Sequence, residues 1–364
     1  MKAYGINEKT IKWIESYLSN RKQRVVMGEV TSEWLPITSS VVQGSVLGPI
    51  LFVIYINDLP DHLNNICKMY ADDNKVLSKI EEEKDAQTFQ QDINRLCLWS
   101  NEWLLKFNIE KCHIMHFGKN NPKFKCSMQD RELNESIIER DIGVFITNDL
   151  KSTNHVKMSA SKANKMLGLL LNTFNYLDLD TFKVLYNSYV RPQLEFGVSA
   201  WNPYLRKDIE ILERVQRRAT KKAPGLSGYE YEERLKILGL TSLEERRVRG
   251  DLIQQFKIVN GIERVKWHHP PTFKAEQSRE GPASGVRGHK YSYHKDKFND
   301  GIRLNFFNNR IANDWNVLPD EVVNSRSVNS FKAKIDKIYD KNGTYKRSSK
   351  KKQADKADFV SDEN

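Results

Sequence analysis

Tyr70-Ala71-Asp72-Asp73 is an acidic tetrapeptide between two short apolar runs. Residues 66–77 are predicted to form a β-hairpin that turns at residues 71–74. An acidic pair in a turn is ordinarily only turn chemistry. Here the flanking residues are apolar, which predicts that the carboxylates project from a buried hairpin. Two carboxylates held in this way, with a third from a neighbouring strand, can bind two Mg²⁺ ions about 4 Å apart and promote phosphoryl transfer.

A glycine-bearing turn, Gln43-Gly44-Ser45-Val46-Leu47-Gly48-Pro49, precedes a second apolar run. Ser45 can cap a helix and Pro49 suits a first helical turn, so we predict a buried helix over residues 46–55. Gly44 has no Cβ and lets a backbone, base or sugar approach closely. The helix N-terminus is a natural phosphate site. An ordinary loop-to-helix junction is the alternative interpretation.

Helices and strands are interleaved over the first 150 residues, which is typical of an α+β domain. The expected elements, besides the hairpin and the helix above, are helices over 9–20 and 85–104 and strands over 21–27, 35–42, 112–117 and 142–146, with a turn at 28–34. The helix at 85–104 is predicted to place on its inner side Phe89, Ile93, Leu96, Leu98 and Trp99.

Beyond residue 150 the apolar positions recur at helical spacing almost throughout. Helices are predicted over 156–174, 180–190, 207–222, 231–238, 242–260 and, last, 331–338. The core of the last helical module is predicted to contain Phe306, Phe307, Ile311 and Trp315. We expect domains at 1–150, 151–265, 266–300 (a linker loop), 301–340 and 341–364 (a disordered basic tail).

The chain of 364 residues carries a net charge of +11, which favours a polyanionic partner. Aromatic residues make up 10%, too many for a disordered chain. The first residues lack a secretory signal, and the longest apolar run is too short to cross a bilayer. We therefore expect a nuclear or cytoplasmic protein with no membrane partner.

The four cysteines are widely spaced, with no Cys-x-x-Cys pair. A zinc site at Cys112, His113 and His116 would need a second ligand pair, and none follows at a useful spacing. We expect neither zinc nor disulfides here.

Several motifs resemble the reverse transcriptase of non-LTR (LINE-type) retrotransposons, the jockey-like clade and its vertebrate relatives above all. The resemblance spans roughly residues 4 to 340 and is carried, in order, by residues 43–59, 70–73, 103–113, 141–144, 189–203, 249–253 and 306–319. It implies a right-hand polymerase: a partial palm, made of an antiparallel sheet with helices, followed by a mainly helical thumb and C-terminal region. The partners it implies are an RNA template, a DNA primer and dNTPs.

The same resemblance assigns roles to individual residues. Asp72 would bind Mg²⁺ directly, with Asp73 as its helper beside the primer terminus. Lys111 would approach the leaving pyrophosphate. The incoming nucleotide and the template base would be contacted by Gln43, Gly44, Ser45 and Tyr70.

One predicted thumb helix is strongly basic. Its candidates for contact with the nucleic-acid backbone are Arg214, Arg217, Arg218, Lys221 and Lys222. The helix also carries Glu210 and Glu213, so a solvated face of mixed charge is the alternative.

The chain departs from the family at its start. The family's palm has a further carboxylate on a strand just upstream of the element that begins at Tyr4, and residues 1–8 offer only Glu8. The positions of Ser40, Val42 and Asn74 also differ from the usual pattern. We expect an N-terminally truncated RNA-directed DNA polymerase that does not extend a primer alone. The alternatives are a non-catalytic nucleic-acid-binding protein and a helical interaction protein whose charge serves solubility.

Overall fold

The computed structural model describes residues 1–42, 44–174, 176–274, 289–298 and 300–342, with only the backbone for 340–342. The chain divides into two units, residues 1–136 and the residues from 137 onward. Gln43 and the predicted basic tail from residue 343 lie outside the described residues. The five predicted domains stay predictions.

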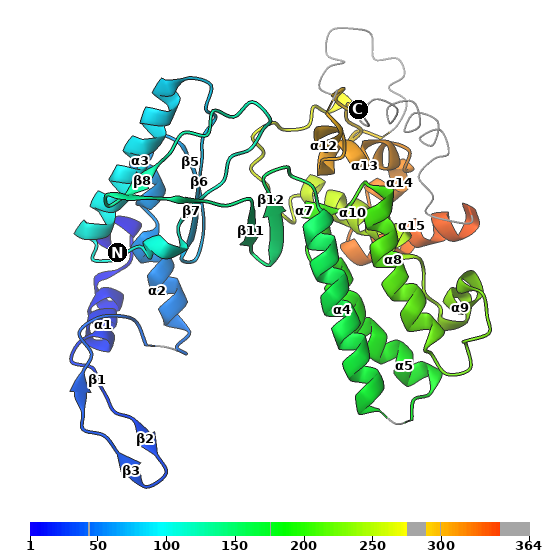
Figure 1. The fold of residues 1–364 in the computed structure, drawn as a ribbon, viewed down its shortest axis with the longest axis horizontal. Coiled ribbons are helices and arrows are strands. Elements are labelled where there is room, and N and C mark those ends of the chain that lie inside the picture. The colour runs from blue at the N-terminus through cyan, green and yellow to red at the C-terminus, as the bar shows by residue number, and fades with distance from the viewer. Residues whose placement is uncertain (43, 175, 275–288, 299, 343–364) are drawn as a thin grey trace. The chain divides into compact units, whose positions relative to one another are not determined.

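The first unit joins three α-helices to short paired strands (Figure 1). Its helices are η1 (Lys2–Tyr4), α1 (Glu8–Leu18), α2 (Leu47–Ile56), η2 (Leu59–His62), α3 (Glu83–Glu102) and η3 (Ile109–Lys111). Its strands are β1 (Lys22–Gln23), β2 (Val26–Met27), β3 (Val30–Thr31), β4 (Leu35–Pro36), β5 (Ile66–Tyr70), β6 (Asp73–Leu77), β7 (His113–Ile114), β8 (Ser127–Met128), β9 (Arg131–Glu132) and β10 (Asn134–Glu135). Antiparallel pairs are β1–β4, β2–β3, β5–β6 and β8–β9, and β7–β10 is parallel.

The core of the first unit lies between α3 and one face of the β5–β6 hairpin. Side chains alternate across a strand, so Cys67, Met69 and Val76 pack inward while Ile66 and Leu77 stay exposed. Helix α3 contributes the side chains of Ile93, Leu96 and Trp99 to this core. The hairpin is therefore buried on one face only.

Three predictions for this unit were wrong. Helix α2 is apolar on all sides but buried on one side only: Leu51 and Ile56 are buried, whereas Ile50 and Val53 are each about half exposed. Leu98 lies on the outer side of α3 and is 68% exposed. Val30–Thr31, placed in a turn by the sequence, forms β3 because the chain already reverses at Gly28 and Glu29.

The second unit begins with a hairpin and continues in helices (Figure 1). Its strands are β11 (Ile138–Asp141) and β12 (Val144–Thr147), which pair antiparallel. Its helices are α4 (Thr153–Thr173), α5 (Leu179–Leu185), η4 (Tyr186–Val190), α6 (Arg191–Glu195), α7 (Val198–Trp201), α8 (Arg206–Lys221), α9 (Tyr231–Leu238), α10 (Leu243–Val259), α12 (Gly301–Leu304), α13 (Phe307–Asn316), α14 (Asp320–Val323) and α15 (Val328–Asn342).

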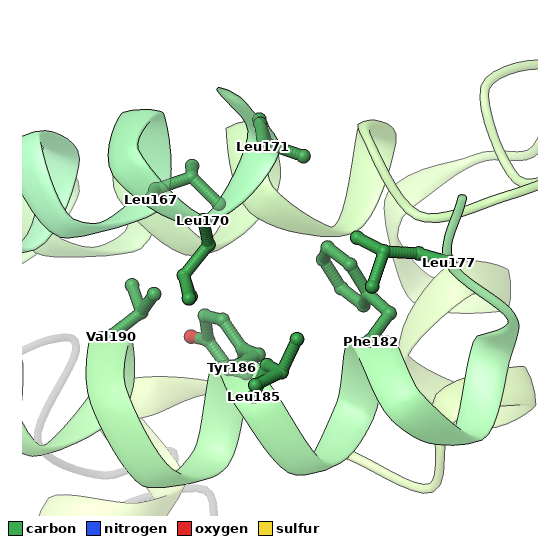
Figure 2. A pocket seen from close by; sticks show the side chains of 8 residues that line it. All are labelled: Leu167, Leu170, Leu171, Leu177, Phe182, Leu185, Tyr186 and Val190. Atoms are coloured by element: carbon green, nitrogen blue, oxygen red, sulfur yellow. The ribbon is translucent and has the colours of Figure 1, made fainter. Parts of the chain in front are cut away.

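One core of this unit forms where α4 packs on α5, η4 and α8. Figure 2 shows leucines of α4 facing Phe182, Tyr186 and Val190 around an enclosed apolar void. The void measures about 10 Å³, at the lower edge of the ~10–15 Å³ that a single water molecule needs. It is therefore a packing gap and not a ligand site.

The helix formed by α5, η4 and α6 widens at η4, a π-helical turn in which Arg191 N–H donates to the Tyr186 carbonyl. Pro192 follows directly. Because proline has no N–H, it cannot donate to the carbonyl four residues earlier, and a local change of hydrogen-bond register accommodates that loss.

A second core joins α10, α13 and α15, with Trp315 and Phe331 fully buried. Arg310 on α13 forms a bidentate ion pair with Asp251 on α10, at 2.8 Å for each nitrogen–oxygen contact, and both side chains are almost fully buried. Phe307, Ile311 and Trp315 are core residues as predicted. Phe306 is not, since its ring is 44% exposed.

Candidate functional site

The acidic pair lies at the tip of the β5–β6 hairpin, as the sequence indicates. Tyr70 pairs with Asp73, so the turn consists of Ala71 and Asp72 alone. Ala71 has a φ of 52°, in the left-handed region that a tight hairpin turn requires. Both carboxylates are exposed, and the Asn74 side-chain amide donates to the Asp72 carbonyl at 3.3 Å.

A buried carboxylate on α3 fixes the start of this hairpin. Asp92 is fully buried and accepts hydrogen bonds from the backbone N–H groups of Asn64 and Asn65 at 2.8–3.1 Å. Burial alone would raise the pKa of Asp92, but these bonds and one from Arg95 at 2.9 Å lower it. Sequence reasoning missed Asp92, because its partners are about 28 residues away along the chain.

The open face of the hairpin displays Tyr70 and Asp73. Because Met69 and Val76 point into the core, their neighbours along each strand point the other way, and Tyr70 is 62% exposed. This face lies on the opposite side of the hairpin from the core of the first unit. It can therefore meet a large ligand.

The residues present do not complete a metal site. Two Mg²⁺ ions need a set of carboxylate ligands, and no cluster of three or more His, Cys, Asp or Glu suited to a metal occurs among the described residues. Asp72 and Asp73 are the carboxylates at the hairpin tip. By themselves these two carboxylates fall short of the ligand set that two Mg²⁺ ions need.

The glycine turn caps α2 as predicted. Ser45 Oγ accepts a hydrogen bond from Gly48 N–H at 3.0 Å and donates to the Val42 carbonyl at 2.7 Å. Gly44 has a φ of 79°, and a Cβ there would meet no heavy atom within 4 Å. Gly44 is thus required by its backbone conformation and faces open space, where a ligand can approach.

Lys111 ends the short helix η3. Ile109 and Cys112 on either side of it pack against the core, which leaves Lys111 exposed. Within the described ranges, no hydrogen bond or ion pair joins Lys111 to Asp72 or Asp73. Its predicted role stays a prediction.

The basic residues of α8 lie on its exposed face, while Leu212, Val215 and Ala219 face the core. The exposed set contains Arg214, Arg217, Arg218, Lys221 and Lys222. Arg217 also stacks on the Tyr231 ring, with its guanidinium carbon 4.9 Å from the ring centre.

Glu213 does not share this face. It is buried, where it accepts hydrogen bonds from the Tyr231 hydroxyl and from Leu243 N–H at 3.1 Å. Burial raises the pKa of Glu213. Glu210 is exposed but pairs with Arg206 at 3.4 Å, at the beginning of the helix. Of the two acidic residues on which the mixed-charge alternative depends, only Glu210 is therefore exposed on α8.

A shallow groove of about 460 Å³ runs between α4 and α8. Arg214 and Arg218 line it, together with Asn164 from α4 and apolar side chains. Sequence reasoning missed Asn164, because the pairing of α4 with α8 is not a local property of either helix. Arginine and amide groups together offer donors to phosphate oxygens.

The cysteines form no metal or redox centre in the described parts of the chain. All four are free thiols that contribute to the core of the first unit. Burial raises the thiol pKa of Cys67, Cys112 and Cys126, which keeps these groups protonated and unreactive. The described helices include none with the length and hydropathy to span a membrane.

Comparison with known proteins relates these features to one family. The reverse transcriptase (RNA-dependent DNA polymerase) family matches residues 1–171, which include the acidic hairpin, the glycine turn and Lys111. The match covers just under half of the chain, so residues 1–171 are similar to that family. The mixture of helices and small two-stranded sheets in the matched segment is consistent with a polymerase palm.

The relatives confirm the resemblance to retrotransposons. The RNA-directed DNA polymerase from mobile element jockey of Drosophila melanogaster is 24% identical over 232 residues, 59% of this chain and 25% of that protein. The probable RNA-directed DNA polymerase from transposon BS of the same species is 25% identical over 230 residues, 57% of this chain and 25% of that protein. The chain thus spans about a quarter of the length of these relatives. No solved structure matches the chain significantly.

Proposed function

We propose that this chain binds a nucleic-acid duplex, an RNA template paired with a DNA primer, and does not extend the primer on its own. The observation that carries this proposal is the exposed basic face of α8, from which Glu213 is withdrawn into the core. Such a face, with the arginine-lined groove beside it, suits the regular spacing of phosphates along a duplex.

The family relationship supports a role for each unit. The β5–β6 hairpin would lie in the palm, with Asp72 and Asp73 towards the primer terminus and Tyr70 and Ser45 near the nucleotide. Helices α4 and α8 would form the thumb. The reverse transcriptase family generally uses divalent metals, but the hairpin offers two carboxylates without a third. Polymerisation by this chain alone is for that reason not expected.

Binding to an RNA–DNA hybrid, followed over a range of salt concentrations, tests the first half of the proposal. Replacing Arg214, Arg217 and Arg218 together by Gln should weaken binding and make the slope of log K against log [salt] shallower by about 3, if each side chain contacts one phosphate. The matched control replaces Lys2, Lys9 and Lys12, three exposed lysines of the first unit, and should retain the slope. Equal losses in the two triple variants would contradict the assignment to α8.

Primer extension with Mg²⁺ and dNTPs on an RNA template tests the second half. We expect no incorporation by the chain alone. Incorporation that Asp72→Asn abolishes would overturn this half and leave the binding proposal standing.

One rival remains, a helical interaction protein whose charge serves only solubility. It predicts no binding to the hybrid even at about 50 mM salt, where phosphate contacts are strongest. Binding at that concentration that is lost as salt rises would exclude it.

A further inference from the structure

Arg303 on α12 lies between two exposed aromatic rings. Its guanidinium carbon is 5.2 Å from the ring centre of Phe298 and 5.2 Å from that of Phe306. The two rings are 37% and 44% exposed. The sequence pattern assigns Phe306 to the core, so its exposure is a property of the fold that hydrophobic burial does not explain.

Trp267 extends this arrangement on the other side of Phe306. The two ring centres are 6.4 Å apart and the ring planes meet at 79°, an edge-to-face contact. Trp267 also lies nearly parallel to Phe307, 6.5 Å away, and Phe307 is buried. The core therefore anchors one end of the array and solvent meets the other. We refer to Trp267, Phe298, Arg303 and Phe306 as the aromatic–arginine surface.

Two asparagine side chains of α13, the buried Asn309 and the half-buried Asn316, hold the segment that carries Phe298. Asn309 Oδ1 accepts from Asp296 N–H at 3.2 Å, and Asn309 Nδ2 lies 3.4 Å from the carbonyl oxygens of both Asp296 and Arg303. Asn316 exchanges hydrogen bonds with the backbone of Tyr293 at 3.1 and 2.8 Å. The surface is thus positioned by the fold, although most of its residues lie in loops.

The charge on this surface is available to an anion. Among the described residues no carboxylate forms an ion pair with Arg303, and the nearby Asp300 accepts a hydrogen bond from Ile302 N–H at 2.9 Å. Exposed lysines adjoin the aromatic residues in the chain, Lys266 before Trp267 and Lys297 before Phe298. Flat rings, a planar cation and flanking ammonium groups together match bases joined by phosphates.

We propose that the aromatic–arginine surface stacks the unpaired bases of single-stranded nucleic acid. Bases in a duplex are already stacked on each other, so this surface selects strands whose bases are free. Stacking tolerates any base, because every base has a π-face, and the lysines contact the backbone. The site is separate from the α8 face and does not need it.

The probes are a uridine oligonucleotide of about 20 residues and its DNA counterpart, because neither forms a duplex. This length exceeds the ~4–16 nucleotides that a typical single-strand binding site covers. Phe306→Ala in the full chain should weaken binding by about 5- to 100-fold. Phe306→Tyr should retain it. Arg303→Lys keeps the charge but loses the planar stack, and should weaken binding by about threefold. Val317→Ala removes another exposed apolar side chain from α13's C-terminal end and is the matched control.

A 2-aminopurine base within the oligonucleotide reports stacking directly, because its fluorescence falls when it stacks. Quenching that Phe306→Ala abolishes and Phe306→Tyr restores supports the proposal. Affinity unchanged within twofold in Phe306→Ala, or no binding of either strand by the native chain, overturns it. Unequal affinity for RNA and DNA tells which strand the surface prefers. The α8 triple variant should keep the quenching, so the two binding proposals fail separately.

Discussion

One face of the β5–β6 hairpin packs on the core of the first unit, and its other face is open. Helix α8, in contrast, is covered by α4, α9 and α10 on every side except its basic face. Both units leave large apolar side chains in solvent, Val53 and Tyr70 in the first and Tyr176 and Val317 in the second. The first unit buries the carboxylate of Asp92, whereas the second buries several charged groups, among them Arg310 and Asp251, which pair with each other. Both units come from the same chain, so composition alone does not explain the contrast.

The contrast teaches where each kind of surface is useful. A buried ion pair is weak evidence for stability, but removing one partner is costly because it leaves the other charge uncompensated in the core. In the second unit this pair joins α13 to α10, while the basic groove lies between α4 and α8 beside an apolar core. The first unit packs one face of its hairpin against α3 and leaves the other hairpin face and much of α2 open to solvent. Open apolar faces of this kind suit contact with a large ligand.

The largest expected effect breaks the buried ion pair. Arg310→Met leaves the carboxylate of Asp251 in the core without its partner and should lower the free energy of unfolding by about 3–5 kcal/mol. Arg249→Met is the control, because Arg249 forms a bidentate pair with Asp336 that is partly exposed, at 27% and 42%. Chemical denaturation measures both. A loss for Arg310→Met no greater than for the control would show that the second unit is not held as we describe.

Much of the second unit could be predicted because its cues are local. The predicted helix at 231–238 coincides with α9, and Ser242 caps α10 with Glu245 in a capping box. Glu213 could not be placed, because its position on α8 borders both the basic stripe and the core. Only the packing of α9 and α10, which supply Tyr231 and Leu243 as donors, decides that it is buried.

In the first unit and in α13 the misjudged residues are apolar and exposed. Ile50, Leu98 and Phe306 fit the hydrophobic pattern of a core, and a pattern assumes that every apolar face finds cover. The acidic hairpin was predicted, since its turn and its flanking strands are adjacent in sequence. Asp92 and Asn164 escaped prediction because each acts across a long-range contact.

A matched pair of core and surface truncations tests the difference in burial directly. Leu212→Ala on α8 should lower the free energy of unfolding by about 3 kcal/mol, because Leu212 is fully buried. Val53→Ala on α2 should change it by less than about 0.5 kcal/mol. Hydrogen exchange resolved to each unit assigns the loss. If Val53→Ala costs as much as Leu212→Ala, α2 is covered in solution and the contrast between the units fails.

The second unit should also respond to acid through His155. Burial, and then the nearby Lys162, lower the pKa of His155 to about 4. Its Nδ1 accepts from Phe145 N–H at 3.1 Å, and Nε2 lies 3.2 Å from Ser159 Oγ. The unfolded chain takes up a proton near pH 6.5 and the folded chain does not, so stability falls as the pH drops from 6.5 towards 4.

The expected loss by pH 5.5 is about 1 kcal/mol. The difference in unfolding free energy between the native chain and His155→Gln isolates the contribution of His155. Glu213, whose raised pKa acts in the opposite direction, contributes equally to both chains and cancels. Chemical denaturation of both chains at pH 7 and at pH 5.5 gives the four free energies of unfolding that this comparison needs. A difference that does not change between these two values of pH would show that His155 is open to solvent and that β12 is not packed on α4.

The smallest expected effect concerns the cap of α2. Ser45→Ala removes the hydrogen bond to Gly48 N–H and should lower the stability of this helix by about 0.5–1 kcal/mol. Ser45→Asp supplies another acceptor at the same place and should restore it. Because α2 is poorly covered, the loss should appear as faster amide exchange in α2 alone, with α3 unchanged. Faster exchange throughout the first unit would mean instead that α2 and α3 open together, and that this unit is as cooperative as the second.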